Sequence, residues 1–194
     1  MKTLPLDYQS DWRCNNCDNV VATEVVDAEV DRLEQMMNDV DMSDPEKLEE
    51  LLWRLSDGTI LHPRHYIILE LSHSLIFAYK SSDAVSLTRP QMDRKIQLCH
   101  LVLSVSALFI TKLTIKIIFH HFDLKVLGKV DPGFTAWQGK ILNELSNTLL
   151  LISRSDYNKK IINMVAYKKR IYKCMKNVAL AKKCINLGFT GTQG

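Results

Sequence analysis

The chain has 194 residues, of which 46% are hydrophobic and 24% charged, values that suit a single globular domain and exclude a wholly disordered or collagen-like chain. Its 7 glycines and 5 prolines are too few for the many turns of an all-β fold, so long uninterrupted segments favour helices. The net charge of +3 hides an asymmetry: residues 1–57 carry a net −10, residues 58–153 a net +4 and residues 154–194 a net +9.

The first segment, 1–19, has no helical period, and residues 1–14 lack the apolar core that a secretory signal needs. It contains a CxxC pair, Cys14 and Cys17, in a polar turn. The five cysteines of the chain have no disulfide-type spacing, which indicates a reducing, intracellular location, cytoplasmic or nuclear or both.

Two helices are predicted next. The first begins at Thr23, a plausible N-cap, and carries an acidic outer face beside an apolar stripe. That stripe consists of Val26, Val30, Leu33, Met36, Met37 and Val40. The second begins at a capping box formed by Ser43 and Glu46, and ends at Asp57-Gly58. Its stripe consists of Leu48, Leu51, Leu52 and Leu55.

Four further helices follow the same rules. The third has Pro63 in its first turn and runs to about Lys80, and the fourth opens at Thr88-Arg89-Pro90. After a break at 131–133, a fifth is expected over about 135–153 and a sixth over about 157–187. Helices of this length with short loops predict an all-α fold, an antiparallel helical array similar to a degenerate TPR stack, since no clean 34-residue repeat occurs.

Five short motifs occur in a family-like order along nearly the whole chain. They are WxCxxC near Trp12, Lys-Leu-Glu-Glu-Leu-Leu near Leu48, Leu-His-Pro-Arg-His-Tyr over 61–66, Arg-Lys-Ile-Gln-Leu over 94–98, and Val-Asp-Pro-Gly-Phe-Thr over 130–135. In this order they resemble the C-terminal half of the SMYD (SET and MYND domain) family, and most closely its arthropod msta-like branch. Members of that family are S-adenosylmethionine-dependent protein-lysine methyltransferases or inactive relatives of them.

The resemblance implies a division of the chain into a post-SET cysteine-rich remnant (1–22) and a TPR-like helical domain in two parts (23–103 and 128–194). The catalytic elements of the family are absent from this sequence: it has no Asn-His-Ser-Cys motif, no glycine-rich cofactor strand and no MYND array. We therefore expect that these 194 residues bind no S-adenosylmethionine and catalyse no methyl transfer. The expected role is that of a module that binds a protein or peptide and shapes the substrate side of a methyltransferase.

Cys14 and Cys17 are the candidate metal ligands, because two thiolates at CxxC spacing can occupy two corners of a tetrahedral zinc site. The resemblance implies that the other two ligands come from a second CxxC upstream, so zinc is expected only with ligands that this chain lacks. Cys99, Cys174 and Cys184 lie on helical stripes and are predicted to be core residues.

The histidines show no catalytic or metal-binding spacing. His62, with Pro63 and Tyr66, is expected to organise the start of the third helix, and His65, His73 and His100 are expected to cap or pack. The tandem pair His120-His121 has no further ligand at metal spacing.

The C-terminal segment predicts a basic amphipathic helix, a type that can bind anionic lipid, nucleic acid or proteins. The favoured interpretation is a last helix that docks on the core, with its charge partly offset by the acidic first helix. Its docking stripe would be Ile161, Val165, Ile171, Met175 and Val178. The alternative is an independent interaction module that binds a protein through this helix; nucleic-acid and membrane partners are not expected.

Residues 104–127 form the most apolar stretch. A membrane span is disfavoured because Lys112 and Lys116 interrupt it, and a buried helix extension is disfavoured by its many β-branched residues. The resemblance to the SMYD family favours a third interpretation, an insertion without family likeness that represents a translated intron or a splice variant.

Overall fold

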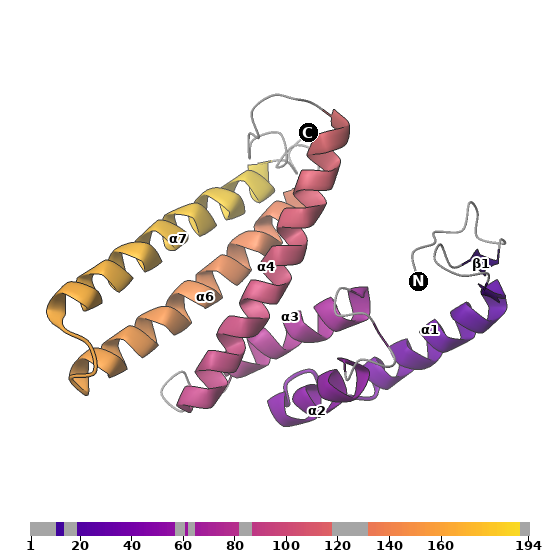
Figure 1. Ribbon diagram of the computed structural model, residues 1–194, viewed down its shortest axis with the longest axis horizontal. Coiled ribbons are helices and arrows are strands. Elements are labelled where there is room, and N and C mark those ends of the chain that lie inside the picture. The colour runs from indigo at the N-terminus through magenta and orange to yellow at the C-terminus, as the bar shows by residue number, and fades with distance from the viewer. Residues whose placement is uncertain are drawn as a thin grey trace.

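The computed structural model describes residues 11–13, 19–56, 61, 65–81, 87–117 and 132–190 (Figure 1). Within these ranges, the side chains of 13, 80, 81, 106–117, 132–135 and 187–190 are left out of the description. Nearly all of the described residues are helical, which confirms the predicted all-α helical array.

The described elements are two short strands followed by helices. A two-stranded antiparallel sheet pairs β1 (Trp12–Arg13) with β2 (Val20–Val21), with Trp12 opposite Val21. The described helices are α1 (Thr23–Asn38), α2 (Pro45–Ser56), α3 (Tyr66–Ser81), α4 (Arg89–Ile117), α6 (Pro132–Asn158) and α7 (Met164–Thr190).

α2 packs on α3, α3 on α4, α4 on α6 and α6 on α7, whereas α1 contacts α3. The array is therefore elongated, with α1 and α2 at one end and α7 at the other (Figure 1). The shared core lies between α1, α2, α3 and α4 and reaches the middle of α6 through Ile141 and Leu145. The four leucines predicted for α2, at 48, 51, 52 and 55, are all buried in it.

The starts of α1 and α2 differ from the sequence prediction by one residue, whereas α6 begins at Pro132, before the predicted 135, and α7 at Met164, after the predicted 157. α1 is preceded by Ala22 at the N-cap, and Thr23 is its first residue and is buried. At α2 the cap is Asp44, whose Oδ1 accepts hydrogen bonds from the backbone N–H groups of Glu46 (3.0 Å) and Lys47 (3.2 Å). Ser43 instead donates its hydroxyl hydrogen to Asp41, so the predicted capping box is wrong. An ionised carboxylate with Pro45 next to it, at the first helical position, makes the stronger cap.

The predicted boundary between the fifth and sixth helices is also wrong, because α6 continues to Asn158. Lys160 then adopts φ 58°. Its N–H bonds the carbonyl of Tyr157 (2.9 Å), and the N–H of Ile161 bonds that of Asp156 (2.8 Å). This is a Schellman ending with lysine in the position that usually holds glycine. Asn163 caps α7, its Oδ1 accepting from the N–H of Ala166.

α4 is a single 29-residue helix that continues into the atypical apolar segment as far as Ile117. The rest of that segment, 118–127, lies outside the described residues. The interpretation of 104–127 as an insertion therefore stays a prediction.

Candidate functional site

The predicted zinc ligands, Cys14 and Cys17, lie outside the described residues. The strands on either side of them, β1 and β2, pair with each other. Within the part of the chain that the structure describes, no group of three or more histidine, cysteine or acidic side chains is placed to hold a metal ion.

The predicted start of the third helix is described only in part, because His62 and Pro63 lie outside the described ranges. Tyr66 is the first residue of α3, and its hydroxyl donates a hydrogen bond to Glu34 of α1. Burial of the phenol and that hydrogen bond raise the pKa of Tyr66 to about 12. His65 acts at the same helix start, its Nδ1 accepting from the N–H of Ile67 at 3.3 Å.

The three described cysteines are core residues, as predicted. Cys99, Cys174 and Cys184 are all buried, and burial raises the pKa of the Cys99 thiol to about 12. A thiol that stays protonated is a poor nucleophile and metal ligand, so none of the three offers reactive chemistry.

Two adjacent residues of α4 hold helices on opposite sides of it. Arg94 Nε lies 2.9 Å from Glu49 Oε1 of α2, and Lys95 Nζ lies 2.9 Å from Glu144 Oε2 of α6. Tyr79 of α3 also donates to Glu49, at 3.0 Å. The Arg-Lys pair within the family-like motif 94–98 therefore has a structural role, joining both halves of the array.

Asp156 fixes the end of the array where α7 begins. Its two carboxylate oxygens accept from Arg89 of α4 (2.6 Å) and Arg170 of α7 (2.7 Å). Desolvation acts to raise the pKa of Asp156, but the hydrogen bonds from the two guanidinium groups outweigh it and hold the pKa below its ordinary value. Of the basic residues of α7, Arg170 is the one that pairs with Asp156, and the lysines take no part in this contact.

The docking stripe predicted for the last helix is wrong at three of its five positions, whereas Ile171 and Val178 are half-buried. Val165 is 75% exposed, Met175 is 64% exposed, and Ile161 lies in the turn before α7 and is also exposed. α7 packs on α6 through smaller side chains instead, with Cys174, Ala181 and Cys184 buried. At Gly139 of α6 a Cβ atom would lie 2.8 Å from the Ala181 carbonyl oxygen, so the two helices meet at close range.

The opposite side of α7 is therefore open, and we call it the outer face of α7. It combines exposed apolar side chains with exposed lysines. The apolar members are Val165, Tyr172, Met175 and Leu180, and the basic ones are Lys168, Lys169, Lys173, Lys176, Lys182 and Lys183. α7 contains no acidic residue, and none of these lysines forms an ion pair in the part of the chain described. Lys176 Nζ lies over the ring of Tyr172, 4.8 Å from its centroid.

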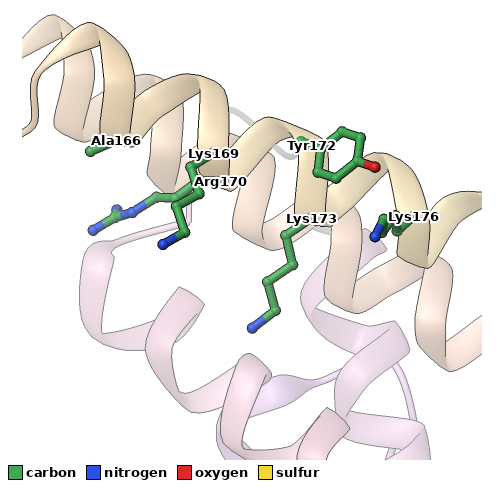
Figure 2. Close-up of a pocket in the computed structure, with 6 residues that line it drawn as sticks. All are labelled: Ala166, Lys169, Arg170, Tyr172, Lys173 and Lys176. Carbon is green, nitrogen blue, oxygen red and sulfur yellow. The ribbon is translucent and has the colours of Figure 1, made fainter.

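One side of this face lines an open pocket of about 410 Å³, whose wall consists of α7 residues (Figure 2). Lys169, Arg170 and Lys173 extend from the same side of the helix, with Tyr172 and Lys176 further along it (Figure 2). The lining is basic and carries one aromatic ring, so its chemistry suits an anionic side chain better than a neutral ligand.

The acidic first helix does not offset the charge of α7. The two helices lie at opposite ends of the array, with the other helices between them (Figure 1). The charge asymmetry of the sequence is therefore a charge separation in space.

Comparison of the chain with protein-family models, with curated proteins and with solved structures found no match. In the described residues, no helix has both the length and the apolar character that a membrane crossing requires.

Proposed function

We propose that this chain is a helical protein-binding module that holds an acidic segment of a partner protein on the outer face of α7. One observation carries the proposal: large apolar side chains and lysines that form no ion pair share the side of α7 that faces away from α6. Exposed large apolar side chains accompanied by polar ones mark surfaces that bind other proteins.

The distribution of side chains favours a protein over a lipid surface. A helix that lies in a membrane interface separates a wide apolar face from its lysines. On α7 the two kinds of residue share one side, where Tyr172 lies between Lys169 and Lys176. A lipid-facing orientation would bury several of these ammonium groups.

A protein partner is also favoured over single-stranded nucleic acid. Proteins that bind such strands without sequence preference use several aromatic rings on which successive bases stack. The outer face of α7 has one exposed ring, that of Tyr172, and three aliphatic or thioether side chains. Those side chains suit the apolar stripe of an amphipathic helix.

The test is binding of a fluorescent synthetic peptide of about five helical turns, with glutamates and leucines at amphipathic spacing. Reversing three lysines of the outer face (Lys169→Glu, Lys176→Glu and Lys183→Glu) should weaken binding at least about tenfold. Each reversed residue would then repel the glutamates of the peptide instead of attracting them. The control reverses exposed charges of α6 and the following turn (Lys140→Glu, Arg154→Glu and Lys159→Glu) and should change affinity less than about twofold.

Two results would contradict the proposal. One is equal weakening by both sets of reversals, which would mean that only net charge matters. The other is equal binding of a peptide of the same composition with scrambled order, because an apolar stripe would then be irrelevant.

We also propose that the module belongs to an SMYD-type protein, in which it would shape the substrate side of a lysine methyltransferase. The support is the all-α array that follows the Cys14–Cys17 pair, the order that the resemblance implies. Cys14 and Cys17 would then hold zinc together with ligands from outside this chain. Saturable binding of S-adenosylmethionine to these 194 residues would contradict the proposal that the cofactor site of such a protein lies outside them.

The test of this second proposal is the mass of the endogenous protein, captured through an antibody to residues 135–190. A mass well above 22.3 kDa, without the tryptic peptide Ile117 to Lys125, would support an SMYD-type protein with 104–127 as a translated intron. A mass near 22.3 kDa with that peptide present would contradict it.

A further inference from the structure

We infer that this protein self-associates head to tail, with α1 of one copy docked on the outer face of α7 of the next. The inference rests on the proposed function of α7 and names a partner for it. It starts from the separation of charge, because the acidic helix α1 and the basic helix α7 lie at opposite ends of one molecule (Figure 1). Each helix carries charged side chains that form no ion pair in the part of the chain described.

The outward side of α1 carries three exposed acidic residues that are free to pair. Glu24, Asp27 and Asp31 have no hydrogen bond or ion pair in the described part of the chain. The other two acids of the helix are already used, since Glu29 pairs with Arg32 and Glu34 accepts from Tyr66. The free carboxylates are thus confined to one side of the first three turns.

The spacing of these acids matches that of the lysines on α7. Glu24 and Asp31 are seven residues apart, and Lys169, Lys176 and Lys183 repeat at the same interval. Seven residues are about two helical turns, or about 10.5 Å, so charges at this interval lie in a row on each helix. Two such rows can pair along neighbouring helices, as charged positions do beside a coiled-coil seam.

Exposed apolar side chains lie beside the lysine row, since Val165 and Tyr172 are within one turn of Lys169. On α1, Val25 is 61% exposed and lies about 100° around the helix from Glu24. Docking would remove these side chains from water and desolvate the neighbouring ion pairs, which strengthens them. The contact is thus more than attraction between opposite charges.

A head-to-tail contact, in which each copy binds two different neighbours, differs from a twofold dimer, in which α1 of each copy would meet α7 of the other. It produces a chain of copies, either an open filament or a ring. The net charge of +3 is small for 194 residues, so long-range repulsion between copies is weak. Because one helix pair is a small interface, we expect reversible, micromolar association that falls as salt rises.

The test is sedimentation velocity of the full chain over a range of concentrations. One variant reverses the acids of α1 (Glu24→Lys, Asp27→Lys and Asp31→Lys), and the other reverses the lysines of α7 (Lys169→Glu, Lys176→Glu and Lys183→Glu). We expect concentration-dependent oligomers of the unchanged protein and monomers of each variant alone. Circular dichroism should show the same helix content for all three.

Mixing the two variants is the decisive measurement. Within each variant α1 and α7 carry charges of the same sign, whereas every α1–α7 contact between the two variants pairs opposite charges, so the mixture should regain the oligomers that each variant alone has lost. The control triple variant at Lys140, Arg154 and Lys159 should oligomerise as the unchanged protein does.

Three outcomes would overturn the inference. A wild-type chain that stays monomeric at low salt while it still binds the synthetic acidic helix would refute self-association and leave the proposed function intact. A dimer that neither reversal weakens would show that copies meet through another surface. Binding to anionic vesicles that matches the peptide affinity, and that only the α7 reversal removes, would place a lipid headgroup where we place α1.

Discussion

Lys95 and Glu144 form an ion pair that is almost wholly buried between α4 and α6. Each side chain is only 4% exposed, and Nζ lies 2.9 Å from Oε2. Two charges are costly to remove from water, and only close pairing compensates. The pair therefore defines how α4 and α6 meet, and neither residue can change alone without leaving an uncompensated charge.

Replacing Lys95 with methionine should destabilise the fold strongly. The ammonium is lost while the Glu144 carboxylate stays buried, a situation that costs about 3–5 kcal/mol. We expect a corresponding fall in the urea midpoint of unfolding, measured by circular dichroism. The double variant Lys95→Met and Glu144→Leu should recover most of the loss, because an apolar pair of similar volume carries no desolvation penalty. Additive losses in the double variant would show that the site depends on shape rather than charge.

His73 gives the fold a pH dependence. It lies in a ring cluster between Phe77 and Trp137, and its Nε2 is buried without a hydrogen-bond partner among the described residues. Burial, and next the charge of nearby Lys140, lower the pKa of His73 in the folded state. The unfolded chain therefore takes up this proton first, at a pH near about 6.5, and the free energy of unfolding falls as pH drops below that value.

A His73→Phe variant should lose this dependence. Its stability should equal or exceed that of the unchanged protein at pH 7, and the difference should widen as the pH falls to about 5. Urea unfolding at a series of pH values measures the difference. His100→Phe is the control, because His100 is exposed on α4 and should leave the pH profile unchanged. A constant difference between His73→Phe and the unchanged protein at every pH would contradict the prediction.

The sequence was most informative where packing follows simple periodicity. The buried leucines of α2 and the buried Cys99, Cys174 and Cys184 agree with their positions on helical stripes. Helix starts were less predictable because several residues near each start can cap. At α2 the carboxylate of Asp44 and the adjacent Pro45 outcompete the hydroxyl of Ser43, which lies one residue earlier.

The outer face of α7 could not be predicted because the helix carries apolar residues on two sides, and either side could have packed on α6. Its large exposed residues suggest one docking side, but α6 approaches through Gly139, and the side of α7 that meets this glycine presents Ala181 and Ile185. Val165 and Met175 are left outside as a result. The choice between the two sides depends on a residue of another helix, which no local pattern reveals. The same holds for Lys95 and Glu144, which are 49 residues apart.

The close contact between α6 and α7 makes Gly139 a sensitive position. An alanine Cβ there would lie 2.6 Å from Ile185 Cγ1, 2.8 Å from the Ala181 carbonyl oxygen and 3.1 Å from the Ile185 nitrogen. Because backbone atoms cannot rotate away, the helices must separate, and we expect a loss of about 1–3 kcal/mol. Alanine normally stabilises a helix interior relative to glycine by about 0.5–1 kcal/mol, so the expected sign is reversed at this site.

Two further variants separate these effects. Asn147→Ala, at an exposed position of α6, should be neutral or slightly stabilising. Gly139→Ala combined with Ile185→Ala should recover only part of the loss, because the Ala181 carbonyl oxygen stays in place. Full recovery in thermal unfolding would mean that the side chain of Ile185, rather than the backbone of α7, limits the approach.

At Lys160 we expect a substitution to stabilise the fold, in contrast to Gly139→Ala. It ends α6 in the left-handed region at φ 58°, a conformation that costs a non-glycine residue about 1–2 kcal/mol. Glycine keeps both backbone hydrogen bonds of the ending but has a more flexible unfolded state, so Lys160→Gly should stabilise by about 0.5–1 kcal/mol. Lys159→Gly removes the same charge one residue earlier, where φ is negative, and should destabilise by a similar amount. Opposite shifts of the unfolding temperature for these neighbouring lysines would identify backbone conformation as the cause, whereas equal shifts would indicate an effect of charge alone.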